Sequence, residues 1–210
     1  MKKLILVFIA IFTTCYVIGQ KVSPNDLLTI TQKQIENEEW EKAEHNLTEL
    51  LKIYPNNTGL LFKRGFVREM NFKYRECISD FTRAIAFNPN MHTARTNRGF
   101  AYRKLGEYSK AIADFTAELE INPNPYSYEH RSYAYYLTED FEKALVDVNI
   151  SIEKDSINSI SYKTRALIYM AMGLKQEACA EKNKAVELKI LEEYPNYGKD
   201  ITELNEYCAE

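Results

Sequence analysis

A proline followed by asparagine returns along this chain at a fixed interval. Pro55, Pro89 and Pro123 are each 34 residues apart, and the last two stand in the nearly identical stretches FNPN and INPN. Proline has no amide hydrogen for the preceding turn of a helix, so a helix normally ends before it. A helix stop at constant spacing predicts one structural unit repeated in tandem, because a period of roughly 20 to 50 residues is typical of solenoids.

The stretch between two of these prolines contains two helical patterns. RTNRGFAYRKLGEYSKAIADFTAELEINPN from Arg95 aligns with LFKRGFVREMNFKYRECISDFTRAIAFNPN from Leu61 at an offset of 34 residues. In the later copy, one apolar helical pattern ends near Gly106 and a second begins at Tyr108. Each unit is therefore predicted to be a hairpin of two helices.

The repeated positions resemble the tetratricopeptide repeat (TPR) family, whose unit has a small residue and a tyrosine on its first helix and an alanine, an aromatic residue and a proline on its second. In the clearest copy these are Gly99, Tyr102, Ala111, Phe115 and Pro123. The same frame predicts repeats at about 24–57, 58–91, 92–124, 125–158 and 159–192, with a capping helix at about 199–209. The resemblance implies an all-α fold for one TPR domain over 20–210, a right-handed α-solenoid of about five hairpins plus the C-terminal capping helix.

The first nineteen residues differ in composition from the rest. Two lysines precede an uncharged run from Leu4 to Ile18, and the small residue Gly19 comes last. This pattern predicts a secretory signal peptide over 1–19 and an exported protein, periplasmic or extracellular, with no membrane span after cleavage. Two alternatives stay open, which are a lipid anchor at Cys15 and an uncleaved membrane anchor, although about 16 uncharged residues are fewer than the ~20 of a usual spanning helix.

Charge and motifs argue against two large classes of function. Removing the two lysines of the signal segment leaves 25 of the 27 basic side chains against 30 acidic ones, whereas a nucleic-acid binder normally has a basic surplus. The sequence has no H-E-x-x-H pair, no G-x-x-x-x-G-K-S run and no G-x-S-x-G motif. We therefore expect a non-catalytic protein with no cofactor, no metal and no nucleic-acid partner.

In four of the five units, an arginine stands directly before the small residue of the first helix, and an acidic residue follows sixteen positions later. The pairs are Arg64 with Asp80, Arg98 with Asp114, Arg131 with Asp147, and Arg165 with Glu181. The first unit has Ile30 and Asn46 at these places, so the two charges are absent together. Because buried charges are normally paired, this pattern predicts structural ion pairs between packed helices and not a ligand site.

Three cysteines follow the signal segment. Cys77 occupies the alanine position of its unit and is expected to be a small core residue. Secreted bacterial TPR proteins often end with an AC and a later YC, and this chain has both, at Cys179 and Cys208. That resemblance implies a disulfide between Cys179 and Cys208, with two separately buried thiols as the alternative.

The resemblance places the function on the concave face, which the first helices line in TPR proteins. The predicted partner-binding residues are inward positions of these helices: Phe62, Lys63, Phe66, Thr96, Asn97, Phe100, Arg103, Lys104, Glu129, His130, Tyr133, Tyr136, Lys163 and Leu167. Rings supply contact area for a peptide and cations attract its acidic groups. The predicted function is a protein- or peptide-binding scaffold or assembly factor, exported to the cell envelope.

Two other interpretations stay open. An aromatic residue at helical spacing packs in a core more often than it binds a ligand. Exposed tyrosines can also stack on sugar rings, which would make the chain a carbohydrate-binding envelope protein; the candidates are Tyr126, Tyr128, Tyr133 and Tyr136. Exposed coplanar rings at one end would favour sugar, whereas a row of rings along the groove with interspersed cations would favour peptide.

Overall fold

The computed structural model describes residues 22–209 of the 210 residues, and the predicted signal peptide with Cys15 lies outside this part. The described residues form helices and no strands, so the predicted all-α fold is confirmed. The hairpins are α2 (Pro24–Glu36) with α3 (Trp40–Ile53), α4 (Thr58–Met70) with α5 (Tyr74–Phe87), α6 (His92–Lys104) with α7 (Tyr108–Ile121), α8 (Pro125–Tyr136) with α9 (Phe141–Lys154), and α10 (Ser159–Ala171) with α11 (Lys175–Glu187). The chain continues through α12 (Ile190–Glu193), η1 (Pro195–Tyr197) and α13 (Gly198–Ala209).

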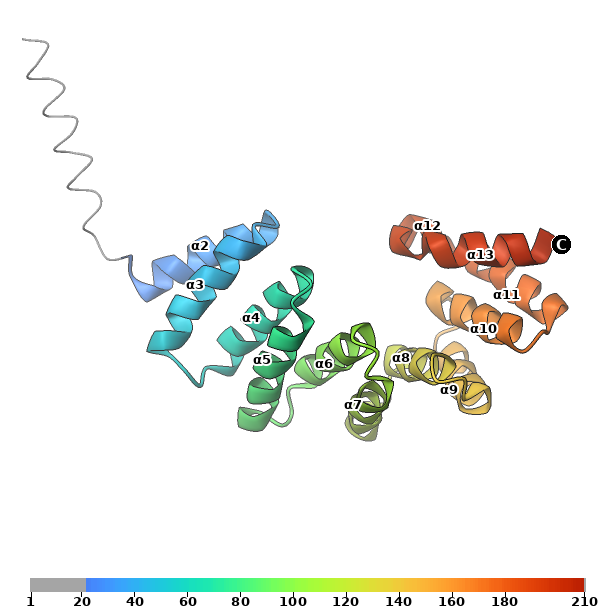
Figure 1. Ribbon diagram of the computed structural model, residues 1–210, viewed down its shortest axis with the longest axis horizontal. Coiled ribbons are helices and arrows are strands. Elements are labelled where there is room, and N and C mark those ends of the chain that lie inside the picture. The colour runs from blue at the N-terminus through green and yellow to red at the C-terminus, as the bar shows by residue number, and fades with distance from the viewer. Residues whose placement is uncertain (1–21, 210) are drawn as a thin grey trace, which may run out of the picture.

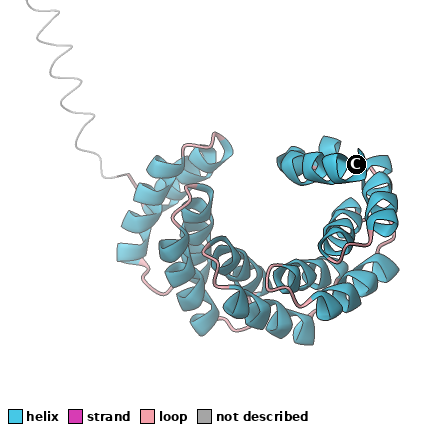
Figure 2. Ribbon diagram, turned by 45° about the vertical axis from the view of Figure 1, so that its right-hand side comes forward, coloured by secondary structure: helices cyan, strands magenta, loops and turns pink. Residues whose placement is uncertain are grey.

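The five hairpins follow one another along an open arc (Figure 1), and each packs on its neighbours in the sequence. The first helices α6, α8 and α10 lie nearer the inner side of the arc than their partners α7, α9 and α11. Seen from a second direction, the arc is open on one side and the C-terminal helices bend over that opening (Figure 2). The protein is therefore an α-solenoid with a concave inner face.

An asparagine one or two residues after the proline helps to start the following hairpin in two of the three copies. The side chain of Asn124 accepts the backbone N–H of Ser127 at 3.0 Å, and Asn57 accepts that of Leu60 at the same distance. Such a bond satisfies one of the N–H groups that have no partner inside the first turn of a helix. Two of the three copies of the motif thus end one helix and cap the next, whereas α6 begins after Met91 without a side-chain cap.

A glycine allows the two helices of a hairpin to approach closely. A Cβ atom added to Gly99 would lie 2.7 Å from Cε1 of Phe115, and one added to Gly65 would lie 2.6 Å from the same atom of Phe81. Both phenylalanine rings are fully buried. The small residue of the repeat therefore makes room for a core ring that comes from the second helix of the same hairpin.

The recurring arginines connect each hairpin to the one before it. Arg98 donates from Nε and Nη2 to both carboxylate oxygens of Asp114, at 2.8 and 2.6 Å, and from Nη1 to Thr82 Oγ1 at 3.0 Å. The other three arginines make equivalent hydrogen bonds: Arg64 to Asp80 and Thr48, Arg131 to Asp147 and Thr116, and Arg165 to Glu181 and Asn149. In each case the carboxylate belongs to the same hairpin as the arginine, whereas the threonine or asparagine belongs to the preceding hairpin. These hydrogen bonds therefore join neighbouring hairpins.

The C-terminal helix is tied to the last hairpin in two ways. Cys179 and Cys208 are joined by a disulfide, and α13 packs against both α10 and α11 through the buried side chains of Ile201 and Leu204. Cys77 is a free, buried thiol. Of the helices in residues 22–209, none is long and apolar enough to cross a membrane.

Candidate functional site

The predicted groove residues fall into three groups by exposure. Ten of them are half-buried on the first helices: Phe62, Lys63, Phe66, Thr96, Asn97, Phe100, Arg103, His130, Tyr133 and Tyr136. Lys104 is exposed, and Glu129, Lys163 and Leu167 are buried. Eleven of the predicted residues therefore keep some surface exposed to solvent.

Three predicted residues do not lie on an open groove. Glu129, Lys163 and Leu167 are only 4%, 1% and 3% exposed. Leu167 packs in one cluster with Ile201 and Leu204 of α13. The physical reason is that the C-terminal segment bends over the inner side of α10 as well as packing on α11. The concave face is consequently closed at its C-terminal end.

A buried charge cluster fills this closed end. Glu129 accepts hydrogen bonds from Thr164 Oγ1 at 2.6 Å and from His130 Nδ1 at 2.8 Å, and Lys163 Nζ lies 3.2 Å from Asp200 Oδ2. Burial by itself raises the pKa of Glu129, but the hydrogen bonds and the charges of His130 and Lys163 together lower it to about 2. These charges are satisfied inside the fold, which assigns them a structural role.

Two tyrosine rings enclose the ammonium group of this cluster. Lys163 Nζ lies 4.6 Å from the ring centre of Tyr133 and 4.1 Å from that of Tyr197 in η1. Burial lowers the pKa of Lys163, while Glu129 and Asp200 act in the opposite direction. Sequence reasoning missed Tyr197 and Asp200 because they belong to no repeat.

Arg103 lies at the centre of the remaining open face. Its guanidinium carbon is 5.4 Å from the ring centre of Phe100 and 4.8 Å from that of Tyr133. Within residues 22–209 the guanidinium makes no ion pair, and its Nε is buried without an acceptor. Every other half-buried arginine of this part donates to a carboxylate or a backbone carbonyl; these are Arg64, Arg68, Arg95, Arg98, Arg131 and Arg165. Arg103 is thus fixed in position by rings and left available to a partner.

A pocket of about 310 Å³ opens beside this centre, where α6 and α8 begin. It is lined by His92, Thr93, Thr96, Asn97, Glu118, Asn122, Asn124, Tyr126, Ser127 and His130. The His130 ring stands edge-on to the Phe100 ring at 4.5 Å, which joins the pocket to the aromatic centre. Three predicted residues, Thr96, Asn97 and His130, therefore share one depression.

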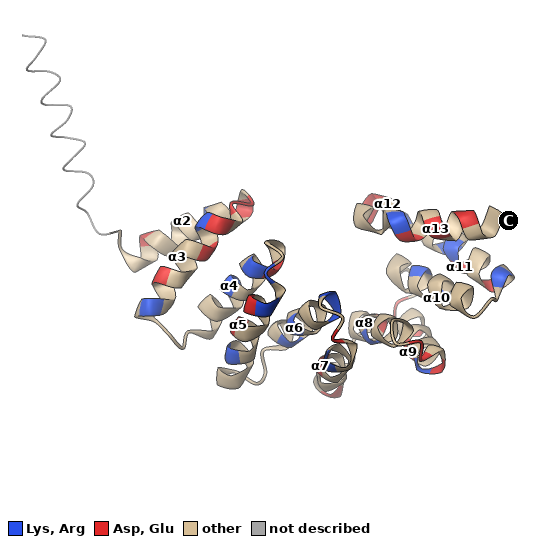
Figure 3. Cartoon of the chain, viewed as in Figure 1, with Lys and Arg blue, Asp and Glu red and all other residues tan. Residues whose placement is uncertain are grey.

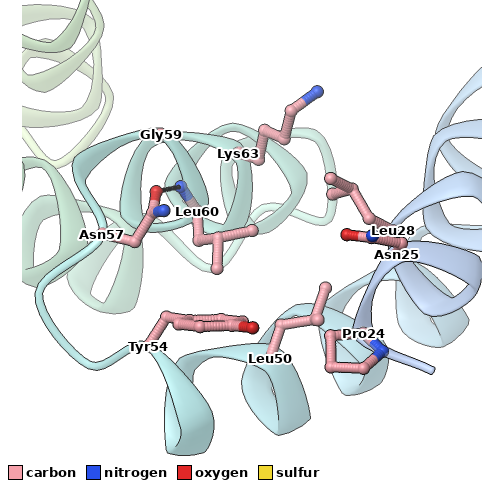
Figure 4. A pocket seen from close by; sticks show the side chains of 9 residues that line it. All are labelled: Pro24, Asn25, Leu28, Leu50, Tyr54, Asn57, Gly59, Leu60 and Lys63. Atoms are coloured by element: carbon pink, nitrogen blue, oxygen red, sulfur yellow. Dashed lines mark hydrogen bonds between the residues drawn. The ribbon is translucent and has the colours of Figure 1, made fainter.

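A second pocket, of about 350 Å³, lies at the N-terminal end of the arc between the first two hairpins (Figure 4). It is lined by Pro24, Asn25, Leu28, Leu50, Tyr54, Asn57, Gly59, Leu60 and Lys63. Lys63 was among the predicted residues, but the apolar residues were not. Leu28 occupies the same repeat position as Phe62, 34 residues earlier, so the 34-residue period could have predicted Leu28.

The four tyrosines considered for sugar binding do not form one surface. Tyr133 and Tyr136 are half-buried, with their rings 5.6 Å apart and inclined by 39°, and burial raises the pKa of Tyr133 to about 12. Tyr128 lies near Arg131 and Lys154 on another side of α8. Only Tyr126 of the four is exposed, so coplanar stacking by this set is excluded.

Charges of both signs are mixed along the arc (Figure 3). Among the residues that the structure describes, no three histidine, cysteine, aspartate or glutamate side chains come together as metal ligands would. The predicted residues that stay accessible carry rings, hydroxyl and amide groups, the His130 imidazole, the amino groups of Lys63 and Lys104, and the guanidinium of Arg103.

Comparison with known proteins agrees with the fold. A family model described as tetratricopeptide repeat matches residues 92–125, which include α6 and α7. MamA from Desulfovibrio magneticus RS-1 superimposes with a TM-score of 0.73 at 18% identity, over 80% of this chain and 97% of that one. The chain has the TPR fold.

Other solved structures share this TPR solenoid. A tetratricopeptide repeat protein from Parabacteroides merdae ATCC 43184 gives a TM-score of 0.66 at 22% identity, over 94% of this chain and 75% of that one. A thermophilic TPR protein from Thermus thermophilus gives 0.65 at 16% identity, over 90% and 100%. Among curated proteins, none matches the sequence. These identities are low enough that the likeness concerns the fold alone.

Proposed function

We propose that this protein is a non-catalytic TPR scaffold that is exported to the cell envelope and binds a protein or peptide on its concave face. The fold supplies the general expectation, since solenoids present extended concave surfaces to partners. Because a fold hosts many functions, the particular claim has to rest on residues of this chain. It rests on Arg103.

The unpaired guanidinium of Arg103 favours a partner that carries carboxylate groups. A buried donor without an acceptor is unfavourable by about 1–3 kcal/mol, so a site that keeps one gains when an acceptor arrives. A carboxylate can take two parallel hydrogen bonds from a guanidinium, which gives both strength and orientation. Phe100 and Tyr133 hold the group in place beforehand, so little further ordering is needed on binding.

Neighbouring features support a peptide over a single small acid. The pocket beside α6 and α8 offers amide and hydroxyl groups and is joined through His130 to Phe100, the ring that Arg103 contacts. The pocket of Figure 4 offers leucines for an apolar side chain. Half-buried rings at Phe66, Phe100 and Tyr133 follow the face with Arg103 between them. An extended chain with one acidic and one apolar anchor would use these features together.

Export rests on the signal pattern of residues 1–19. The Cys179–Cys208 disulfide supports it, because disulfides persist in oxidising compartments such as the periplasm and the extracellular space. The predicted lack of a nucleic-acid partner follows from the acidic balance of the sequence.

The test is chemical cross-linking of the protein in its native cells, followed by identification of captured partners. Arg103→Gln is expected to reduce capture of the specific partner by about tenfold, the loss of one charge-assisted contact. Arg75→Gln, on the exposed side of α5, is the matched control and should capture as well as the wild type. Equal capture by both variants would refute the assignment of the concave face.

A further inference from the structure

A third pocket lies where α8 begins, beside the α9–α10 connection and the end of α12. Its volume is about 470 Å³, which is within the usual range for small-molecule sites. It is lined by Tyr126, Asp155, Ile157, Asn158, Ser159, Glu193 and Tyr194. Tyr126 also lines the pocket beside α6 and α8, so the two depressions share one wall.

Two polar side chains of this pocket have unused hydrogen-bonding atoms. Asn158 and Ser159 are only 7% and 2% exposed. The Oδ1 atom of Asn158 accepts the backbone N–H groups of Ile160 and Ser161 and so caps α10, but its Nδ2 has no acceptor among the described residues. Ser159 Oγ is likewise buried there without a partner. Buried polar groups are nearly always bonded, so two such atoms on residues that line one pocket point to a polar ligand.

Rings and carboxylates complete the lining. Tyr126 is 49% exposed and Tyr194 is half-buried. Asp155 uses one oxygen to accept the N–H of Ile157 at 3.2 Å, and no lysine or arginine belongs to the lining. Burial raises the pKa of Tyr194, and the charges of Glu193, Tyr126 and Asp155, which line the same pocket, raise it further.

The composition of the pocket discriminates between classes of ligand. An anion would meet Asp155 and Glu193 and no cation. An ammonium group would satisfy those carboxylates but has no lone pair to accept from Asn158 Nδ2. Sugar hydroxyls both donate and accept, and the apolar face of a sugar ring packs on tyrosine. We infer that this pocket is a binding site for a neutral sugar, separate from the peptide-binding face at Arg103.

The site differs from the tyrosine platform expected from the sequence. Only Tyr126 belongs to both, whereas Tyr194, Asn158 and Glu193 come from other segments of the chain. A single sequence could not place these segments together, because α12 lies after the last repeat.

Saturation-transfer difference NMR on the full mature protein tests the inference. The probes are the methyl glycosides of glucose, galactose, mannose and N-acetylglucosamine, with Nα-acetyl-lysine amide as the cationic comparison. We expect saturation transfer to at least one glycoside and none to the lysine probe. Failure of all four glycosides, or transfer to the lysine probe alone, would overturn the inference.

Variants locate the binding. Asn158→Asp keeps the oxygen that caps α10 but removes the donor, so it should weaken glycoside binding by about tenfold, and thermal denaturation checks that the variant folds. If Asn158→Asp folds poorly, Ser159→Ala removes the other unbonded polar group of the pocket and tests the same contact. Tyr126→Ala should abolish transfer, and Tyr128→Ala, two residues away on α8, is the control. Undiminished binding in Asn158→Asp and Tyr126→Ala would contradict the site, and Arg103→Gln should have no effect on it.

Discussion

Arginine has two roles on a single helix of this solenoid. Arg98 donates to Asp114 and Thr82, so its charge is satisfied between two hairpins. Arg103, five residues later on α6, contacts two rings and makes no ion pair within the described residues. Hydrogen-bond partners, more than residue type, therefore separate the structural arginines from the one that we assign to a partner.

Glu69 on α4 carries a pH prediction. Burial raises the pKa of Glu69 to about 7, although the positive charges of Lys104 and Arg103 oppose this. Its pKa in the folded state is thus above its ordinary value of 4.5, so the folded protein binds the extra proton and gains stability as pH falls from about 7 toward 4.5. Glu69→Gln, which mimics the protonated form, should raise the free energy of unfolding by about 1–3 kcal/mol at pH 8 and have almost no effect near pH 4.

Urea denaturation at the two pH values measures this difference. Glu41→Gln, at an exposed position of α3, is the matched control. A stabilisation by Glu69→Gln of the same size at both pH values would show that burial of the charge is not its cause.

At the residue scale, the repeat period predicts some of the ion pairs inside the fold but not others. The acid opposite Arg98 could be predicted because arginine and acid are absent together from the first unit. The burial of Lys163 could not, because it depends on Asp200 and Tyr197, which lie outside the repeats. A repeat contains information about its copies and their neighbours only.

At the scale of the element, the hairpin depends on a close approach between its two helices. Gly99→Ala would place a methyl group 2.7 Å from the ring of Phe115, which is fully buried in the core. Overpacking of this kind should destabilise the protein by about 1–3 kcal/mol in urea denaturation.

The control for this change is Gly198→Ala at the start of α13. No atom lies within 4 Å of a Cβ added there, and its φ of −53° suits any residue, so stability should stay the same or rise slightly. If Gly99→Ala were as well tolerated as Gly198→Ala, the proposed role of the small residue would be wrong.

The C-terminal helix depends on its disulfide. Cys208→Ser removes a cross-link between residues 29 positions apart, and a loop of that length corresponds to about 3 kcal/mol in the chain-entropy model. Hydrogen exchange should become faster in α13 and in α10 beneath it, while α2 to α5 keep their rates.

Wild-type protein treated with a reducing agent should give the same exchange pattern as Cys208→Ser. Unchanged protection of α13 in both samples would mean that packing of Ile201 and Leu204 holds the helix without the disulfide. The capping helix itself was predicted from its apolar face, but its extension over the inner side of α10 was not, because no second copy shows how a terminal segment packs.

At the scale of the whole molecule, the fold could be predicted almost entirely from one interval. A 34-residue period fixes paired helices, and stacked hairpins must bury the faces that a single hairpin leaves open. The arc of Figure 1 follows from that constraint, and solved TPR proteins share it at only 16–22% identity. Binding specificity cannot follow in the same way, because the inner-face residues differ from repeat to repeat.

The central claim concerns which face of the arc meets a partner, and site-specific photo-cross-linking tests it most directly. A photoreactive amino acid is placed at Thr96 or Lys104 on α6, and, as controls, at the exposed Ser109 on α7 or Glu142 on α9. The proposal predicts one discrete adduct from both α6 positions, strongly reduced by Arg103→Gln, and none from the controls. Adducts from Ser109 or Glu142 alone, or α6 adducts that persist in Arg103→Gln, would contradict it.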